Sequence, residues 1–220
     1  MKNKSIVIAT GGTGGHIYPG ITLADALKAK GYTVSFIGNK SKMEATIVPQ
    51  AGYSFYGISN QGLVGNPIVK VLRLLSQVFP TFASIKHLRK IKPSRVVVFG
   101  GYVSIPVGIA AWICRIPLFL HEQNAMAGLA NKVLAPLAQG IAVCYSATLT
   151  QFKNKHTYLI GNPRGSLFKQ HDDKDTYFRI LNLVPTIPTV LIVMGSQGSE
   201  TINSQLKELV PLLKNELFQV

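Results

Sequence analysis

The chain is poor in cysteine and in charged residues. Among its 220 residues there are two cysteines, Cys114 and Cys144, which lie in apolar stretches without CxxC spacing. Such cysteines are typical of reduced thiols in the core of a cytosolic protein. Charged residues make up 15% of the sequence and apolar residues 47%, a composition that excludes a disordered chain and is ample for a buried core.

Acidic residues are too few to balance the basic ones. Nine Asp and Glu stand against 23 Lys and Arg, which gives a formal net charge of +14. The basic residues are spread along the chain, and their excess favours an anionic partner such as a phosphate group or an acidic membrane face. Nucleic acid is not expected as a partner, because the sequence has no RNP-like, zinc-finger or other nucleic-acid signature.

Neither an export signal nor a membrane span is expected. The first four residues, "MKNK", lead directly into a short strand, which indicates a protein that is not exported. The most apolar stretch, 102–120, is interrupted by Pro106, Gly108 and Pro117. We therefore predict a helix, a turn and a strand there rather than a helix that crosses a membrane.

Short apolar runs alternate with helical patterns along the chain. Strands are expected at 4–10, 32–38, 53–59, 95–101, 116–122, 140–146, 156–162 and 189–195. Helices are expected at 18–31, 41–52, 103–113, 127–138, 147–152 and 175–182, with a further one that ends near 215. This alternation predicts an α/β fold with a doubly wound, mostly parallel sheet. Ligands bind beyond the carboxyl ends of the strands in such sheets, so the loops after the strands are expected to hold the site.

The sequence predicts one complete domain and the beginning of another. We expect residues 1–163 to form the first domain, 164–188 a polar, turn-rich linker, and 189–220 the start of a second, truncated Rossmann-like domain. A single strand–helix pair cannot bury both of its faces. Either the second domain is cut short or another chain completes it.

A glycine loop, "TGGTGGHIYPG" (10–20), follows the first expected strand. It is not a dinucleotide fingerprint, because Ile17 stands where the third glycine is required and the second strand ends without a carboxylate. It is not a Walker A loop either, because it ends in Gly-Gly-His. These departures disfavour a dinucleotide cofactor and a nucleotide-sugar epimerase.

The glycine loop nevertheless has the features of an anion site. The N–H groups of Thr13, Gly14 and Gly15 lie at a helix N-terminus, where unpaired donors and the helix dipole favour a negative charge. His16 beside them is biased toward the neutral imidazole, which can accept a proton. We predict that the loop is bare so that a diphosphate-bearing substrate can reach its backbone.

Three further stretches carry a resemblance to a known family. They are "FGGYVSIP" (99–106), "HEQNAMAGLANK" (121–132) and "MGSQGS" (194–199). Together with "GGTGGH" they resemble the MurG family of bacterial cell-wall glycosyltransferases, from about residue 4 to the C-terminus. The resemblance implies a GT-B-type fold, in which an N-terminal acceptor domain and a C-terminal UDP-sugar domain, both Rossmann-like, enclose the active site.

The resemblance also implies the reaction. The family transfers N-acetylglucosamine from UDP-GlcNAc to the C4 hydroxyl of MurNAc in lipid I, the undecaprenyl-diphosphate-linked MurNAc-pentapeptide, and so makes lipid II. The transfer inverts the anomeric centre and needs neither a metal ion nor a cofactor. A second hypothesis is a catalytically silent, lipid I-binding half that needs a separate chain for the donor site.

Site residues follow from the matching positions. The resemblance implies that His16 is the general base or a diphosphate contact and that Glu122 is a second-choice base or an orienting group. It also implies that the loop Thr13-Gly14-Gly15 meets a diphosphate or the donor. The remaining substrate and donor contacts implied by the resemblance are Tyr102, Asn124, Arg164, Ser196 and Gln197. The family's Gly-Asn-Pro-Val-Arg pattern is one residue shorter here, "GNPRG". "DKD" (173–175) resembles a metal-binding carboxylate pair, but it lies in the linker, and no metal site is expected.

A basic amphipathic segment, 66–93, fits either a core helix or a helix that lies on an anionic membrane. The family docks on the cytoplasmic face of the bacterial membrane through an apolar patch with a basic rim in this region, so the resemblance favours the membrane. The expected patch consists of Ile68, Leu72, Leu75, Phe79, Phe82 and Trp112. The protein is therefore expected to be a peripheral protein of that membrane face.

Overall fold

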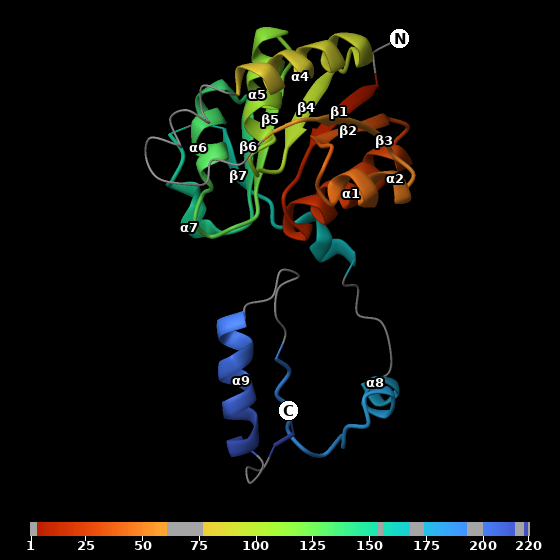
Figure 1. Cartoon of the computed structure of the whole chain (residues 1–220), viewed down its shortest axis with the longest axis vertical. Helices are drawn as coiled ribbons and strands as arrows, with labels where there is room; N and C mark the ends of the chain where they lie inside the picture. The colour runs from red at the N-terminus through yellow and green to blue at the C-terminus, as the bar shows by residue number, and fades with distance from the viewer. Residues whose placement is uncertain are drawn as a thin grey trace. The chain divides into compact units, whose positions relative to one another are not determined.

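The computed structural model describes residues 4–60, 77–153, 156–167, 174–192, 200–213 and 218–219. The chain divides into two compact units, Met1–Leu167 and Phe168–Val220 (Figure 1). The predicted linker 164–188 spans this boundary. Its first residues belong to the larger unit, because they lie in a short 3-10 helix, η2 (Pro163–Leu167), that packs on the first helix.

The larger unit is built on a seven-stranded parallel sheet. Its strands are β1 (Ser5–Ala9), β2 (Thr33–Asn39), β3 (Ser54–Ile58), β4 (Arg95–Val98), β5 (Leu118–Glu122), β6 (Gly140–Val143) and β7 (Thr157–Leu159). Their order is β3-β2-β1-β4-β5-β6-β7, which confirms the predicted doubly wound sheet. In the register of the central strands, Ile8 of β1 lies between Phe36 of β2 and Val97 of β4. The winding reverses between β1 and β4, and sheets of this kind have their binding crevice at that point.

Helices cover both faces of the sheet (Figure 1). Those described in this unit are α1 (Gly14–Ala29), α2 (Glu44–Gln50), α4 (Val78–Ile91), α5 (Ser104–Ile113), α6 (Leu129–Leu134) and α7 (Ser146–Leu149), with a 3-10 turn, η1 (Ala135–Leu137), after α6. The first two pack on one face, and α4, α5 and α6 pack on the other. Because both faces are covered, the strands read as continuous apolar runs.

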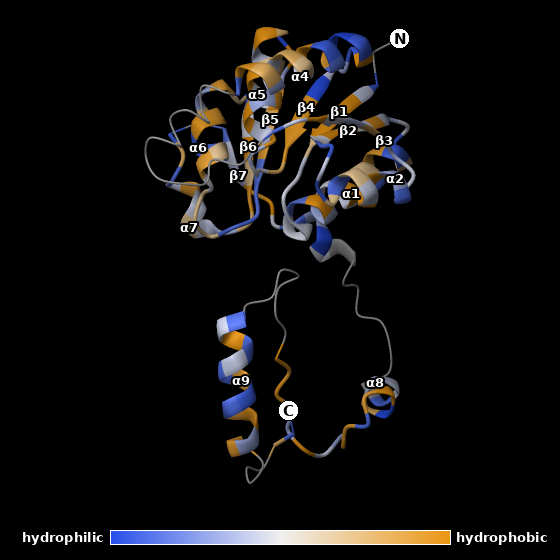
Figure 2. Ribbon diagram, viewed as in Figure 1, coloured by the Kyte–Doolittle hydropathy of each residue, from blue (hydrophilic) through white to orange (hydrophobic). Residues whose placement is uncertain are grey.

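The core consists of two clusters separated by the sheet. In β1, Ile6 and Ile8 point to the side of α1, whereas Val7 and Ala9 point to the side of α5. The first cluster is completed mainly by Ile17, Phe36, Val48 and Phe99, and the second by Leu88, Val98, Val107, Leu120, Leu134 and Ile141. Figure 2 shows the apolar residues concentrated in the strands and on the inner sides of the helices.

Helix α1 begins earlier than the sequence predicts. The expected helix starts at residue 18, but α1 starts at Gly14, because Gly12 takes a positive φ of 93° and Thr13 stands in an extended N-cap position. Only a residue without Cβ adopts such a φ readily. The turn therefore places His16 in the first turn of the helix.

The smaller unit contains α8 (Lys174–Ile180), α9 (Glu200–Leu212) and a single parallel bridge between Thr189 and Gln219. The strand predicted at 189–195 is limited to this bridge within 189–192, and 193–195 lie outside the described residues. Leu191 is 79% exposed, and no residue of α9 is buried. The two helices and the bridge therefore leave much apolar surface exposed. That residues 189–220 are the start of a truncated second domain stays a prediction.

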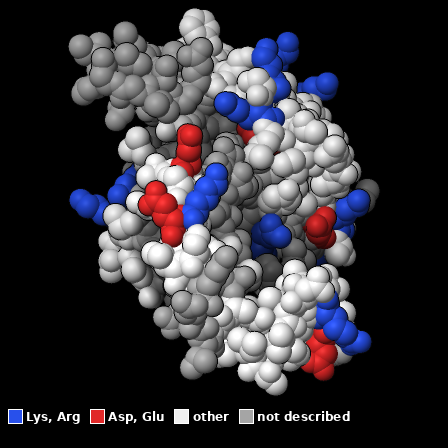
Figure 3. Space-filling view, turned by 60° about the horizontal axis from the view of Figure 1, so that its bottom comes forward, with Lys and Arg blue, Asp and Glu red and all other residues white. Residues whose placement is uncertain are grey.

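No helix within the described parts of the chain is both long and apolar enough to cross a membrane. The segment 102–120 folds as α5, a turn and β5, as predicted. In Figure 3, Lys and Arg side chains lie at separate places among neutral surface, which agrees with their spread along the sequence.

Candidate functional site

Loops after three parallel strands meet around one hollow at the carboxyl edge of the sheet. The hollow has a volume of about 300 Å³ and lies beside the point where the winding reverses. It is lined by His16, Gly100, Gly101, Tyr102, Ile105, Glu122, Asn124, Gly128, Leu129, Ala130 and Asn131. Four residues predicted from the sequence, His16, Tyr102, Glu122 and Asn124, are thus brought together from the first turn of α1, the loop after β4, the end of β5 and the loop that follows it.

His16 stands at the start of α1 with one ring nitrogen already engaged. Its Nδ1 lies 2.8 Å from Oγ1 of Thr13, the N-cap residue. Burial lowers the pKa of His16 below its ordinary value, and the nearby carboxylate of Glu122 acts in the opposite direction. The neutral imidazole is therefore favoured. In the tautomer with a proton on Nδ1, the ring donates to Thr13, and Nε2 accepts from the hollow.

A second glycine turn, Gly100-Gly101, packs directly against the first loop. Both residues have positive φ, 87° and 77°. A Cβ on Gly101 would lie 2.5 Å from the carbonyl oxygen of Gly11, and a Cβ on Gly100 would lie 3.2 Å from Nε2 of His16. The absence of side chains at this turn therefore lets two backbones touch and leaves Nε2 of His16 free of a side chain from Gly100.

Glu122 is a buried hub for the loop that follows β5. It is 1% exposed, and each of its carboxylate oxygens accepts two hydrogen bonds. Oε1 accepts from the main-chain N–H and the side-chain Nδ2 of Asn124, at 3.0 and 3.1 Å. Oε2 accepts from the N–H of Gly128 at 2.8 Å and from Nδ2 of Asn131 at 2.9 Å. A carboxylate has about four acceptor positions, so these bonds occupy them.

Asn131 is a site residue that sequence reasoning missed. It is 1% exposed, and its Nδ2 donates to the carbonyl oxygen of His121 and to Glu122. Its Oδ1 is buried without a partner and belongs to a residue that lines the hollow. Buried acceptors are rarely left unpaired, so this oxygen is suited to a ligand hydroxyl or amide. Asn131 lies in the stretch 121–132 that carries the family resemblance, but no residue spacing in the sequence indicates that its Oδ1 is left without a partner.

The loop that carries Asn124 is braced from α7. Oγ1 of Thr148 donates to the carbonyl oxygen of Asn124 at 3.0 Å, and Oε1 of Gln151 accepts from the N–H of Ala127 at 2.8 Å. Nε2 of Gln151 donates to the carbonyl oxygen of Ala125 at 2.8 Å. Asn124 is itself exposed, and its amide keeps an oxygen and a second N–H for a ligand.

The remaining predicted residues lie elsewhere. Arg164, in η2, stacks on the ring of Tyr18 with its guanidinium carbon 4.9 Å from the ring centroid, and it does not line the hollow. Ser196 and Gln197 lie outside the described residues, as do Ile68, Leu72 and Leu75 of the expected membrane patch. Their roles stay predictions.

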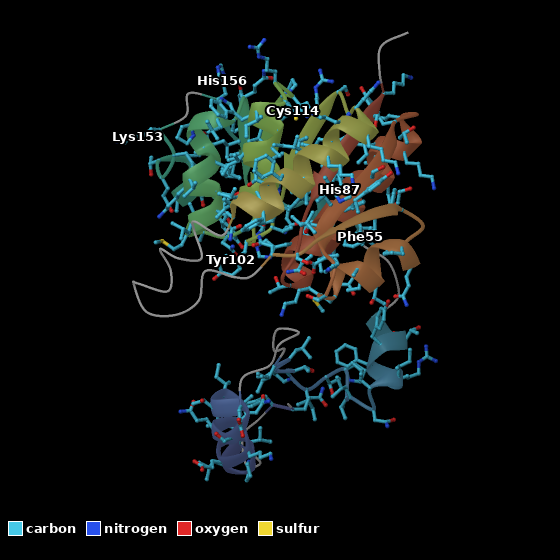
Figure 4. The ribbon with its side chains drawn as sticks, turned by 45° about the horizontal axis from the view of Figure 1, so that its top comes forward. Phe55, His87, Tyr102, Cys114, Lys153 and His156 are labelled. Carbon is cyan, nitrogen blue, oxygen red and sulfur yellow. The ribbon has the colours of Figure 1, made fainter. Side chains whose placement is uncertain are left out.

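Two other hollows differ in place and chemistry. One of about 590 Å³, lined partly by Lys132, Lys153 and His156, lies toward the amino ends of the strands, away from Tyr102 (Figure 4). The other, of about 510 Å³, is an apolar groove between α4 and α5. Because ligands of parallel sheets bind at the carboxyl ends of the strands, the hollow beside His16 is the candidate site.

Comparison with solved structures identifies the class of protein to which this fold belongs. The crystal structure of Acinetobacter baumannii MurG matches with a TM-score of 0.70 and 27% sequence identity, over 96% of this chain and 58% of that one. The seven-stranded parallel α/β fold is thus that of a GT-B glycosyltransferase.

The family follows from the sequence. The model of the glycosyltransferase family 28 N-terminal domain matches residues 6–143, more than half of the chain, and the chain belongs to this family. Two curated relatives are each called UDP-N-acetylglucosamine--N-acetylmuramyl-(pentapeptide) pyrophosphoryl-undecaprenol N-acetylglucosamine transferase. The one from Aeromonas hydrophila subsp. hydrophila is 37% identical over 93% of this chain and 55% of its own length. The one from Acidithiobacillus ferrooxidans is 39% identical over 91% of this chain and 54% of its own. The chain thus spans about half the length of these relatives.

Proposed function

We propose that this chain provides the acceptor-binding half of an inverting glycosyltransferase that moves N-acetylglucosamine from UDP-GlcNAc to the C4 hydroxyl of MurNAc in lipid I. The observation that carries the proposal is the convergence of His16, Tyr102 and Asn124 on one hollow beside the N-terminus of α1. The reaction stated in the relatives' names supports it. The alternative is a catalytically silent lipid I-binding half that needs a separate chain for the donor site.

His16 is the better of the two candidate bases. Burial lowers its pKa and so favours the neutral imidazole, and Nε2 lies beside Gly100, which has no side chain to cover it. The carboxylate of Glu122, in contrast, already accepts four hydrogen bonds and has no free position for a substrate proton. We therefore assign Glu122 to positioning Asn124 and Asn131, with its charge stabilising the imidazolium that forms on His16.

The proposed step is a direct displacement. Nε2 of His16 takes the proton from the C4 hydroxyl while that oxygen attacks the anomeric carbon from the face opposite UDP. The bond from the anomeric carbon to the diphosphate oxygen breaks, and its electron pair leaves with UDP, so the configuration inverts. The diphosphate of the acceptor lies against the N–H groups of Gly14 and Gly15, since the first turn of a helix has donors without internal partners. We also propose that Arg164, Ser196 and Gln197 contact the UDP-GlcNAc donor.

The surface of α4 and α5 is the proposed contact with an anionic cytoplasmic membrane face. The two helices pack together, and Phe79, Phe82 and Trp112 are 80%, 66% and 56% exposed. The basic side chains of Lys86, Arg89 and Lys90 lie on the same helix as the two phenylalanines, and all three are exposed. Exposed aromatic residues beside cationic ones suit a lipid surface with acidic headgroups.

Transfer of radiolabelled N-acetylglucosamine from UDP-GlcNAc to a short-chain lipid I analogue tests the proposal, with binding of the analogue measured on the same sample. Replacing His16 by Ala is expected to lower turnover by roughly 10²–10⁴-fold, the usual contribution of a general base, with little loss of binding. His156→Ala is the matched control, because His156 lies toward the other edge of the sheet. Binding without turnover in the unaltered chain would support the alternative. Absence of binding would refute both.

A further inference from the structure

A carboxylate that belongs to none of the predicted site residues lies beneath the glycine loop. Glu44, the first residue of α2, has no exposed surface. Its Oε2 accepts from the N–H of Gly12 at 3.3 Å, and its Oε1 accepts from the N–H of Asn39 at 3.0 Å. Both donors are main-chain groups, one in the loop after β1 and one at the end of β2. The side chain therefore joins two loops at the carboxyl edge of the sheet.

The surrounding glycines are fitted to this side chain. A Cβ on Gly11 would lie 2.3 Å from Oε1 of Glu44, and a Cβ on Gly38 would lie 2.7 Å from its Cγ. In contrast, a Cβ on Gly12 would meet nothing within 4 Å. Position 11 of the glycine loop thus requires glycine, because the carboxylate of Glu44 occupies the space that a Cβ would need. The prediction that the loop is bare for a ligand applies only to its other glycines.

Hydrogen bonds extend from this carboxylate to the loop after β4. The side-chain Nδ2 of Asn39, whose N–H is held by Glu44, donates to the carbonyl oxygen of Asn60. Nδ2 of Asn60 in turn donates to the carbonyl oxygen of Tyr102 at 2.8 Å. The loops after β1, β2, β3 and β4 are therefore linked, directly or in sequence, to one buried group.

The need to fill the space between these loops does not explain why a carboxylate, rather than an apolar side chain, stands at position 44. Burying a carboxylate costs free energy even when it is hydrogen-bonded, so an apolar side chain would occupy the same volume more favourably. A carboxylate, however, offers acceptors in two directions, which a buried pair of N–H groups from different loops requires. Asp lacks the length to reach both donors. Gln would turn an NH₂ group toward one of them.

We propose that Glu44 is a positioning residue. It holds the glycine loop so that the first turn of α1 and the imidazole of His16 face the diphosphate-bearing acceptor. This inference rests on the proposed function, because it names what sets the geometry of that same site. Glu44 itself does not touch the substrate.

The test compares Glu44→Gln and Glu44→Asp with a matched control, Glu208→Gln, since Glu208 is exposed on α9. Amide exchange at Gly12 and Asn39, exchange in the central strands, and the NMR titration of His16 are measured on the whole chain. Binding of the short-chain lipid I analogue is then measured for each variant. We expect exchange at Gly12 to accelerate at least tenfold, the His16 titration to shift, and affinity to fall about tenfold, with the central strands still protected.

Each outcome decides a separate question. Wild-type affinity and an unchanged His16 titration in Glu44→Gln would overturn the inference. Loss of protection throughout the sheet, in step with the loss of binding, would also overturn it, because Glu44 would then serve the whole fold. If the unaltered chain does not bind the analogue, the proposed function fails. Exchange at Gly12 and the titration of His16 would still decide whether Glu44 positions the loop.

Discussion

Replacing Glu122 by Gln tests the assignment of this residue as a structural hub. The carboxylate accepts two hydrogen bonds on each oxygen, and all four donors belong to the loop and helix that follow β5. Gln preserves the shape but puts an NH₂ group in place of one oxygen. Whichever way the amide turns, two donors lose their acceptor and face another donor.

The expected cost follows from those two bonds. A hydrogen bond to a charged group contributes roughly 1.5–3 kcal/mol, so the loss of two predicts a destabilisation of about 3–6 kcal/mol. A typical domain has a free energy of unfolding of only about 5–15 kcal/mol. The free energy of unfolding of Glu122→Gln should therefore be much lower than that of the unaltered chain. We also expect the pKa of His16 to fall further, because the Glu122 carboxylate raises it in the unaltered chain.

Urea unfolding followed by tryptophan fluorescence measures this cost in the larger unit, because Trp112 in α5 is the only tryptophan. NMR titration of His16 measures the second effect. Glu208→Gln, on the exposed surface of α9, should change the free energy of unfolding by less than about 0.5 kcal/mol. A loss below about 1 kcal/mol in Glu122→Gln, with Asn124 and Gly128 still protected from exchange, would refute the reasoning.

Two further predictions concern pH and the membrane. Burial lowers the pKa values of His16, His87 and His121 from the ordinary 6.5. The unfolded chain therefore binds more protons, and the free energy of unfolding should fall as the pH drops from about 7.5 to 5.5. Urea titrations at high salt, which screens repulsion among the basic side chains, check this, and greater stability at the lower pH would contradict it. Phe82→Ser should weaken sedimentation with anionic phospholipid vesicles about tenfold or more, since burial of a Phe contributes roughly 1.5–3 kcal/mol. Tyr158→Ser is the control, because Tyr158 on β7 is an exposed aromatic residue at 56% against 66% for Phe82, and equal losses in the two variants would argue against a contact through α4.

The seven strands of the larger unit could be predicted because their signal is local. A strand buried on both faces needs a continuous apolar run, and a turn with positive φ needs glycine, so both features are written in consecutive residues. Parallel sheets bind ligands at the carboxyl ends of their strands, and this rule was sufficient to predict that His16, Tyr102 and Glu122 lie at the same edge of the sheet. The predicted start of α1 was four residues too late, because its first turn contains Gly14 and Gly15, and glycine is not typical of a helix.

The sequence alone determined the fold class and the family, and it predicted the edge of the sheet that holds the candidate site, because these depend on short-range patterns and on motifs of fixed spacing. Only the tertiary structure decided which polar groups are satisfied within the protein and which remain for a ligand. Glu44 lies 32 positions from Gly12 along the chain, and no local pattern reveals that its carboxylate explains a missing side chain at Gly11. The unpaired Oδ1 of Asn131 is likewise a property of packing between β5 and α6. Hydrogen bonds between distant loops depend on distances that the fold sets, and residue spacing does not encode those distances.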